Sequence, residues 1–317
     1  MTETILSIRN LKTYFFTRRG TVKAVDGVDF DLMKSECLCL VGESGCGKTV
    51  TALSILGLID SPPGRIVGGE IYYDHLNLLD CPSDQLRHIR GKEIAMIFQD
   101  AQSALNPVFT IGNQIEEQVR LHLGVSHHQA REKAISLLGE VGIPSPEKVV
   151  AHYPHQLSGG MRQRAMIAMA LACNPKLLIA DEPATALDVI VQAQVLEVMR
   201  NLKTRLNLSM ILITHDLSII AEMCDRVAIM YAGKIVEYGS ARDIFKNPQH
   251  PYTKGLIGAF PSIRGPKKSL QSIPGSPPNL LNPPPGCRFH PRCPQAMPIC
   301  RKEEPKVVKL GGGHIVS

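Results

Sequence analysis

The stretch "CLCLVGESGCGKTVTALSILGLI", residues 37–59, joins a short apolar run to a glycine-rich turn and then to a periodic segment. This order predicts a buried strand, a loop and a helix. Within the loop, Gly42 to Thr49 fit the spacing G-x-x-x-x-G-K-[ST], which in this context binds nucleotide phosphates. Glycines let backbone N–H groups curl around phosphate oxygens, and the helix N-terminus adds partial positive charge.

Two side chains of this loop are suited to triphosphate chemistry. Lys48 can reach the β- and γ-phosphates, and the Thr49 hydroxyl can coordinate Mg²⁺. The candidate nucleotide-binding residues here are Gly42, Glu43, Ser44, Gly45, Cys46, Gly47, Lys48, Thr49 and Val50.

A second candidate lies in "LLIADE", residues 177–182, where an apolar strand ends in two acids. Parallel α/β sheets bind ligands at the carboxyl ends of their strands. Asp181 there suits a Mg²⁺ contact, and Glu182 could polarise the attacking water as a general base. Two acids at the end of a buried strand are costly unless metal or water compensates.

The composition is that of an ordinary soluble protein, with 317 residues of which 44% are hydrophobic and 20% charged. The start "MTETILSIRN" has no basic segment followed by an apolar run, so we expect no signal peptide. The longest apolar stretch, "AMIAMALAC" at 165–173, is too short to span a bilayer, which takes about 20 residues. We therefore expect a reducing compartment, where disulfides are disfavoured.

Charge and proline gather in the last part of the chain. Residues 241–317 hold twelve Lys and Arg, three Asp and Glu, and 14 of the 23 prolines. A solvated basic extension, a nucleic-acid-binding tail and a nearby anionic membrane surface all fit this charge. Aromatic residues are sparse there, which argues against nucleic acid.

Periodicity predicts an α/β fold. Alternating polar and apolar residues over 1–40 predict antiparallel strands, and about 101–160 reads as an inserted helical subdomain. Further on, a helix at 161–173, a strand at 176–181, a helix near 188–206 and a strand at 210–216 predict a mostly parallel sheet. "RVAIMYAGKIVEYG" predicts a hairpin that turns at Ala232-Gly233.

The stretch "LSGGMRQR", residues 157–164, resembles the signature motif of the ATP-binding cassette (ABC) ATPases. The resemblance covers residues 1–240 as a nucleotide-binding domain. It implies a P-loop NTPase (RecA-like) core with an antiparallel β subdomain, the helical subdomain and, at 241–317, a small irregular extension. In this family two subunits enclose two ATP molecules, each between one phosphate loop and the other subunit's signature. Ser158, Gly159 and Gly160 would thus bind the nucleotide of a second, identical or homologous ATPase subunit.

Other family features match in order. Gln99 stands where the family has a glutamine that senses Mg²⁺ and couples to the membrane partner. His215 matches the switch histidine that contacts the γ-phosphate, and "ALD" at 186–188 resembles the D-loop. Phe15 is the expected adenine-stacking aromatic, with Tyr14 and Phe16 as rivals because strand alternation leaves the register open.

"IFQDAQSALNPVFTIGNQI" (97–115) resembles the dipeptide and oligopeptide permease branch, although Ala101 and Gln102 depart from its usual wording. "NPQHPYTKGLI" (247–257) and "PGSPPNLLNPPPGCRFHPRC" (274–293) are similar to that branch's tail. The resemblance implies an ATP-hydrolysing subunit that powers import of di- or oligopeptides, peripheral on the cytoplasmic face of the plasma membrane. Its partners would be two transmembrane permease subunits and, indirectly, an extracytoplasmic peptide-binding protein, with no nucleic acid. Import of another solute such as nickel, and a non-transport ABC ATPase, are the alternatives.

Cys287, Cys293 and Cys300 cluster in the extension. In a reducing compartment such a cluster is more often a metal site than a disulfide set. A zinc site completed by His290, an iron–sulfur cluster and three unliganded thiols remain open. Some members of the peptide branch hold a [4Fe–4S] cluster in this tail, with a fourth cysteine after a segment like "GGGHIVS". The resemblance therefore favours [4Fe–4S], with the fourth ligand a cysteine beyond Ser317 or another group, unless the site is vestigial.

The surroundings of the three thiols lead to two further expectations. We expect the cysteines to lie away from the ATP chemistry. We also expect Arg288, Arg292, Arg301 and Lys302 to offset the thiolate charge.

Overall fold

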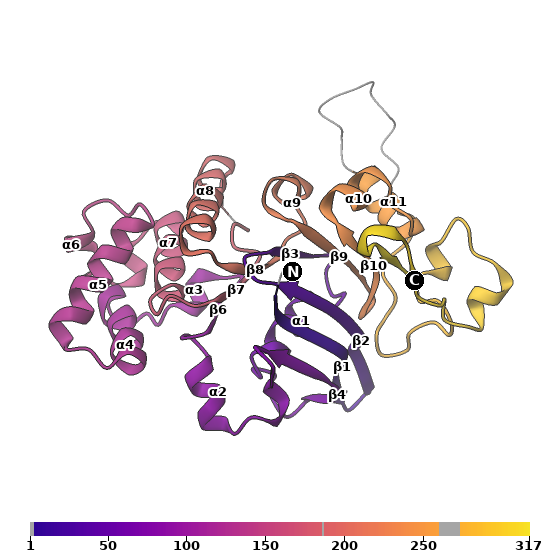
Figure 1. Ribbon diagram of the computed structural model, residues 1–317, viewed down its shortest axis with the longest axis horizontal. Helices are drawn as coiled ribbons and strands as arrows, with labels where there is room; N and C mark the ends of the chain where they lie inside the picture. Colours follow the sequence, from indigo (N-terminus) through magenta and orange to yellow (C-terminus); the bar gives the residue numbers. More distant parts are fainter. Residues whose placement is uncertain (1–2, 186, 260–272) are drawn as a thin grey trace. The chain divides into compact units, whose positions relative to one another are not determined.

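The structure, a computed structural model, describes residues 3–185, 187–259 and 273–317 (Figure 1). The chain forms two compact units, the first made of residues 1–80 and 214–317 and the second of residues 81–213. The second unit is thus inserted between two segments of the first. Each unit has its own strands, helices and buried apolar residues.

An antiparallel sheet of four strands belongs to the first unit, in the order β2-β1-β4-β5. The strands are β1 (Thr4–Thr17), β2 (Gly20–Met33), β4 (Gly64–Tyr73) and β5 (Leu76–Asn77). In β1 the alternation places Leu6 and Ile8 in the core, while Ser7 between them is half-buried. The antiparallel pairing of β1 with β2 confirms the prediction for residues 1–40.

The first unit contains five more strands, which are β3 (Cys37–Val41), β9 (Arg226–Tyr231), β10 (Lys234–Ser240), β11 (Val308–Lys309) and β12 (Ile315–Val316). Strand β3 runs parallel to β9 and is buried throughout, as its apolar run predicts. Strands β9 and β10 form the predicted hairpin. Ala232 and Gly233 at its turn both have positive φ, 49° and 82°, as a two-residue type I′ turn requires.

The helices of the first unit are α1 (Lys48–Ile55), α9 (Leu217–Met223), α10 (Ala241–Lys246) and α11 (Pro251–Gly258). Short 3-10 turns follow at His290–Arg292 and Pro298–Arg301. Strand β12 pairs with β10, and Figure 1 shows the described end of the chain, in yellow, beside α10, α11 and β10. The C-terminal extension is therefore a set of short elements docked on the first unit.

The second unit holds three parallel strands, β6 (Ile94–Ile97), β7 (Leu177–Asp181) and β8 (Ser209–Ile213), all of them buried. Its helices are α2 (Ser83–Ile89), α3 (Ala101–Ala104), α4 (Ile111–Leu123), α5 (His127–Glu140), α6 (Pro146–Val149), α7 (Gly159–Ala170) and α8 (Val189–Leu206). Helices α4, α5, α6 and α7 gather into one cluster (Figure 1). The helix predicted at 161–173 begins two residues earlier, because Ser158 caps its N-terminus.

The α/β class expected from the sequence is confirmed by these elements. Among the helices of the described residues, none combines the length and the apolar character that a membrane span requires.

Candidate nucleotide site

The phosphate loop connects β3 to α1 in the first unit, as predicted. Gly47 caps α1 at φ 110°, a conformation that side chains disfavour. A Cβ on Gly47 would lie 2.4 Å from the carbonyl oxygen of Ala24, and one on Gly42 would lie 2.2 Å from that of Met230. Only glycine fits either position, so the backbone of the loop can curl closely.

Lys48 lies at the base of this loop. Its buried Nζ donates to the carbonyl oxygens of Gly42, at 2.7 Å, and Glu43, at 3.1 Å. These contacts hold the ammonium inside the ring of backbone that would surround the phosphates. Thr49, the next residue, is exposed, so its hydroxyl is open to a metal ion or phosphate.

The other loop residues divide by burial. Ser44 and Gly45 are exposed at the tip, Val50 is half-buried in the first turn of α1, and Cys46 is buried. Burial raises the pKa of the Cys46 thiol, which therefore stays neutral. The loop cysteine fills space and is no candidate for a nucleophile.

The three aromatic candidates for adenine stacking differ in their surroundings. The Tyr14 hydroxyl donates a hydrogen bond to Asp26 at 2.5 Å. Burial is the larger cause and this hydrogen bond the next that raise the pKa of Tyr14 to about 12. Phe15 is half-buried against Gly64, and Phe16 is 51% exposed. These contacts do not decide which ring would stack on adenine, so Phe15 stays the predicted stacking residue, with Tyr14 and Phe16 as its rivals.

The acidic pair lies at the end of β7 in the second unit. Asp181 is 1% exposed. Glu182 has φ 46°, and its N–H donates to the carbonyl oxygen of Ile213 at 2.9 Å. Its Oε2 accepts from Gln99 Nε2 at 3.1 Å and from Thr185 Oγ1 at 3.0 Å. The structure thus brings the side chains of Gln99 and Glu182 together. Glu182 itself has an uncommon backbone conformation, of the kind found at functional sites.

The signature residues start α7. Ser158 accepts a hydrogen bond from the Met161 N–H at 3.3 Å, which caps the helix, and Gly159 and Ser158 are exposed. Gly160 is half-buried in the first turn. The helix therefore presents an accessible N-terminus free of bulky side chains, which favours anion binding. Ala186 of the predicted D-loop lies outside the described residues.

His215 is exposed between β8 and α9, in the first unit with the phosphate loop. The next residue, Asp216, caps α9 by accepting from Ser218 N–H at 2.8 Å. Gln99, Asp181, Glu182 and the signature belong to the second unit. The predicted site residues therefore form two sets, one in each unit.

The cysteine segment is folded back on itself. The N–H of Cys287 donates to the carbonyl oxygen of Cys300 at 2.9 Å, and His290 Nδ1 lies 2.9 Å from the carbonyl oxygen of Cys287. All three thiols are half-buried, and burial raises the pKa of Cys287. In the described part of the chain, the three thiols do not form a set of ligand atoms within 4.8 Å of one another.

The expectation that the three cysteines lie away from the ATP chemistry stays a prediction, but other residues of their segment contact the phosphate loop and the sheet beside it. Arg292 forms an ion pair with Glu43 of the phosphate loop, and Arg288 forms one with Asp26 of β2. These two arginines pair with carboxylates, so the expectation that they offset thiolate charge is wrong for them. For Arg301 and Lys302 it stays a prediction. No local pattern could have indicated either contact, because each joins residues from opposite ends of the chain.

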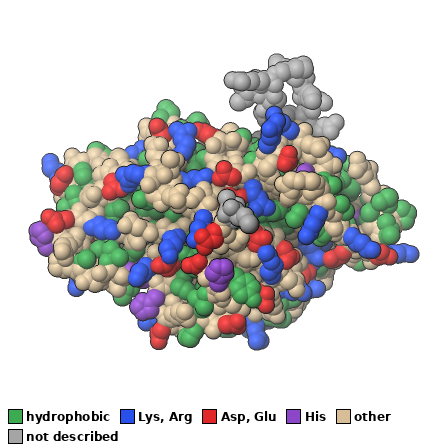
Figure 2. All heavy atoms as spheres, in the orientation of Figure 1, with side chains coloured by type: hydrophobic (Ala, Val, Ile, Leu, Met, Phe, Trp, Pro, Cys, Tyr) green, Lys and Arg blue, Asp and Glu red, His purple; other side chains and the backbone are tan. Residues whose placement is uncertain are grey.

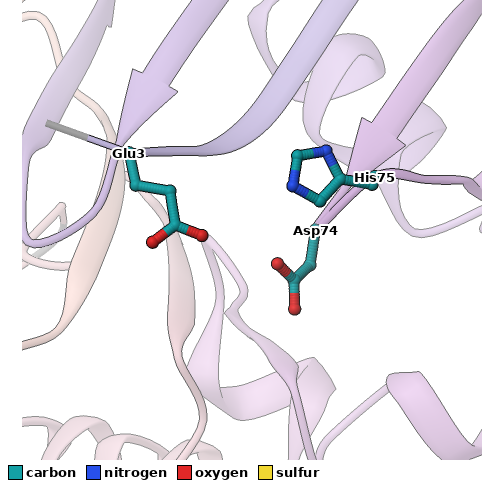
Figure 3. A group of neighbouring side chains, drawn as sticks. All are labelled: Glu3, Asp74 and His75. Carbon is teal, nitrogen blue, oxygen red and sulfur yellow. The ribbon is translucent and has the colours of Figure 1, made fainter. Parts of the chain in front are cut away.

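A further group of possible metal ligands lies elsewhere, at Glu3, Asp74 and His75 (Figure 3). Asp74 and His75 come from the turn between β4 and β5, and all three residues are exposed. Glu3 already pairs with Lys34 at 2.7 Å. Exposed acidic groups of this kind are common without a metal, and we assign it no role.

Two family descriptions match the sequence. Residues 25–185 match the family described as "ABC transporter". Residues 236–300 match the one described as "Oligopeptide/dipeptide transporter, C-terminal region". The match of the second includes all three clustered cysteines.

Known proteins resemble nearly the whole chain. The oligopeptide transport ATP-binding protein AppD of Bacillus subtilis (strain 168) is 50% identical over 99% of this chain and 95% of its own length. The dipeptide transport ATP-binding protein DppD of the same organism is 49% identical over 99% of this chain and 94% of its length. A dimeric structure of the ATP-binding cassette MJ0796, in a post-hydrolysis state bound to ADP and Pi, is also similar. It has a TM-score of 0.67 and 25% identity, over 75% of this chain and 99% of that chain.

Proposed function

This chain belongs to the ABC transporter family, and from that membership we propose that it is the ATP-binding and ATP-hydrolysing subunit of an importer for di- or oligopeptides. The observation that carries the proposal is the likeness over 99% of the chain to proteins named for oligopeptide and dipeptide transport. The match of residues 236–300 to the peptide-transporter C-terminal region supports it independently of the ATP motifs.

The phosphate loop would bind the triphosphate through its backbone N–H groups, Lys48 and the N-terminus of α1. Thr49, Asp181 and Gln99 are the residues that would hold Mg²⁺, because their oxygens are the hard ligands this ion takes. When bound, Mg²⁺ neutralises charge on the phosphate oxygens. Phe15 would stack on the adenine.

Hydrolysis would depend on Glu182. A water oxygen attacks the γ-phosphorus, the bond to the β–γ bridging oxygen breaks, and Glu182 takes the proton of the water. The hydrogen bonds from Gln99 and Thr185 hold the carboxylate of Glu182 in a defined position for this step. His215 would contact the γ-phosphate and stabilise its charge.

A second ATPase subunit would complete each ATP site. The exposed start of α7 at Ser158, Gly159 and Gly160 is suited to a phosphate, and one chain already has a phosphate loop. The likeness to an ABC cassette solved as a dimer supports this pairing. Closure on ATP and reopening after hydrolysis would drive the transport cycle.

The remaining partners follow from the peptide-importer family. Two transmembrane permease subunits would hold the chain at the cytoplasmic face of the plasma membrane, and an extracytoplasmic peptide-binding protein would deliver the substrate. On the face drawn in Figure 2, basic and acidic side chains are interspersed. A nucleic-acid interface instead carries a continuous basic stripe, and the described residues of this face form none.

For the extension we propose an iron–sulfur cluster on Cys287, Cys293 and Cys300, with a fourth ligand not among these three. Such a cluster would stabilise the fold of a Pro-rich segment that has few apolar residues to bury. Anaerobically purified protein should be brown, absorb near ~400 nm and contain iron and sulfide. Colourless protein with stoichiometric zinc would contradict the proposal.

The test of the main proposal is peptide uptake by proteoliposomes that contain the chain, its permease subunits and its binding protein. Uptake of a labelled dipeptide or oligopeptide should require ATP. It should be abolished by Lys48→Ala, which removes the phosphate contact. Lys246→Ala, a change to an exposed lysine of α10, serves as the matched control and should transport normally. Uptake of nickel or another solute, with no peptide uptake, would favour the alternative importer.

A further inference from the structure

The ion pair between Arg292 and Glu43 joins the C-terminal extension to the phosphate loop. Arg292 Nη1 lies 2.6 Å from Glu43 Oε2, and Nη2 lies 2.9 Å from Oε1. Two parallel N–H···O bonds of this kind are stronger and more directional than a single contact. The Arg292 side chain is 6% exposed and that of Glu43 is 27% exposed, so water screens the pair only in part.

The guanidinium of Arg292 is held by further hydrogen bonds besides those to Glu43. Its Nε donates to the carbonyl oxygen of Pro274 at 2.8 Å, and Nη2 also donates to that of Gly275 at 3.3 Å. Nη1 lies 3.4 Å from the Tyr231 hydroxyl. These contacts fix the plane of the guanidinium, so the geometry differs from that of a loose surface salt bridge.

The extension also holds the backbone of Glu43. The N–H of Glu43 donates to the hydroxyl of Tyr252 in α11 at 3.0 Å. Tyr252 packs against Tyr231 and Phe289, with ring centroids 4.7 Å and 5.4 Å away. Phe289 lies three residues before Arg292 in the chain, so one buried aromatic cluster positions both contacts to the loop.

Glu43 places a carboxylate on a loop whose task is to bind anions. An unpaired carboxylate there would repel the phosphates. Since the first turn of α1 holds no acidic residue, this repulsion would come from Glu43 and not from the helix. Arg292 neutralises this charge while Tyr252 fixes the backbone next to it. We propose that Arg292 is a positioning residue for ATP, through which the C-terminal extension keeps the phosphate loop competent to bind nucleotide. This inference rests on the proposed ATP site.

The test measures the Kd of a fluorescent ATP analogue for the full chain and its variants. Arg292→Gln should raise the Kd about tenfold, because it leaves the Glu43 carboxylate uncompensated on the phosphate loop. At an effective dielectric near 20, one charge acting over about 10 Å changes an affinity by about this factor. Arg292→Lys keeps the charge and should raise the Kd less. Arg301→Gln, an exposed arginine of the same segment, is the matched control and should bind like wild type.

The decisive variant is Arg292→Gln combined with Glu43→Gln. Removing both charges should return the Kd to within about threefold of wild type, whereas a merely structural role of Arg292 predicts no rescue. If Arg292→Gln does not fold, Glu43→Gln alone still tests the idea and should bind ATP more tightly than wild type, because the loop then loses a negative charge. Normal binding by folded Arg292→Gln, absent rescue in the double variant, or unchanged or weaker binding by Glu43→Gln would each overturn the inference. Failure of the wild-type chain to bind ATP would instead refute the proposed site.

Discussion

His250 should make the stability of the first unit depend on pH. It is 5% exposed at the start of α11, and its Nδ1 accepts the N–H of Tyr252 at 3.1 Å. A ring nitrogen that accepts a hydrogen bond must carry no proton. Burial lowers the pKa of His250 to about 4, with Lys254 lowering and Glu237 raising it to smaller extents. The folded chain therefore keeps this imidazole neutral.

The size of the effect follows from the two pKa values. The unfolded chain protonates His250 near its ordinary pKa of 6.5, and the folded chain does so only near 4. Between these values the unfolded state holds more protons, so the free energy of unfolding falls as the pH falls. The stabilisation is complete above about pH 6.5 and decreases by about 2 kcal/mol between pH 7 and pH 5, at ~1.4 kcal/mol per pKa unit.

Urea unfolding at pH 7 and pH 5 measures this difference. The comparison is with His250→Asn, because asparagine can still accept at the helix cap but does not titrate. The variant should be less stable at pH 7, since it packs less against Phe289. Its loss of stability between the two pH values should be about 2 kcal/mol smaller than that of wild type. Equal pH dependence of the two proteins would refute the buried neutral histidine.

Three substitutions test the nucleotide site itself. Glu182→Gln should still bind ATP but nearly abolish ATP hydrolysis in the assembled transporter. The control Glu197→Gln, on the exposed face of α8, should bind and hydrolyse ATP like wild type. Wild-type hydrolysis by Glu182→Gln would contradict the proposed role of Glu182. Ser158→Arg should leave ATP binding intact but prevent ATP-dependent dimerisation in a sedimentation assay, and an unchanged dimer would count against the two-subunit site. Gly47→Ala should lower stability by about 2–4 kcal/mol and abolish ATP binding, because the new Cβ meets a backbone oxygen at positive φ. Gly45→Ala, whose Cβ would meet no atom within 4 Å, should cost only about 1 kcal/mol in the same denaturation assay.

The residues that we propose to bind phosphate can be predicted from the sequence because they depend on local chain geometry. The loop at 42–49 and the helix start at 158–160 need only glycines, a helix N-terminus and one side chain at fixed spacing. The strands and helices around them follow periodicities of a few residues, and the turn at Ala232-Gly233 follows from turn chemistry. The strands, the helices and this turn are confirmed at nearly the predicted positions.

Contacts between distant segments could not be assigned in this way. Gln99 and Glu182 are 83 residues apart, and their hydrogen bond depends on how β6 and β7 pair. Resemblance to the ABC family indicates a role for each residue, but not the contact between them.

Arg292 illustrates the same limit more strongly. It is 249 residues from Glu43, and its sequence context offers thiolates as the nearest charges to neutralise. The residue type alone does not show whether an arginine faces solvent, a thiolate or a carboxylate. Its environment is set by the packing of Tyr231, Tyr252 and Phe289, which depends on the whole first unit. The residues proposed for the ATP site can therefore be predicted from short motifs. The ion pair that joins the phosphate loop to the C-terminal extension forms only when the chain folds.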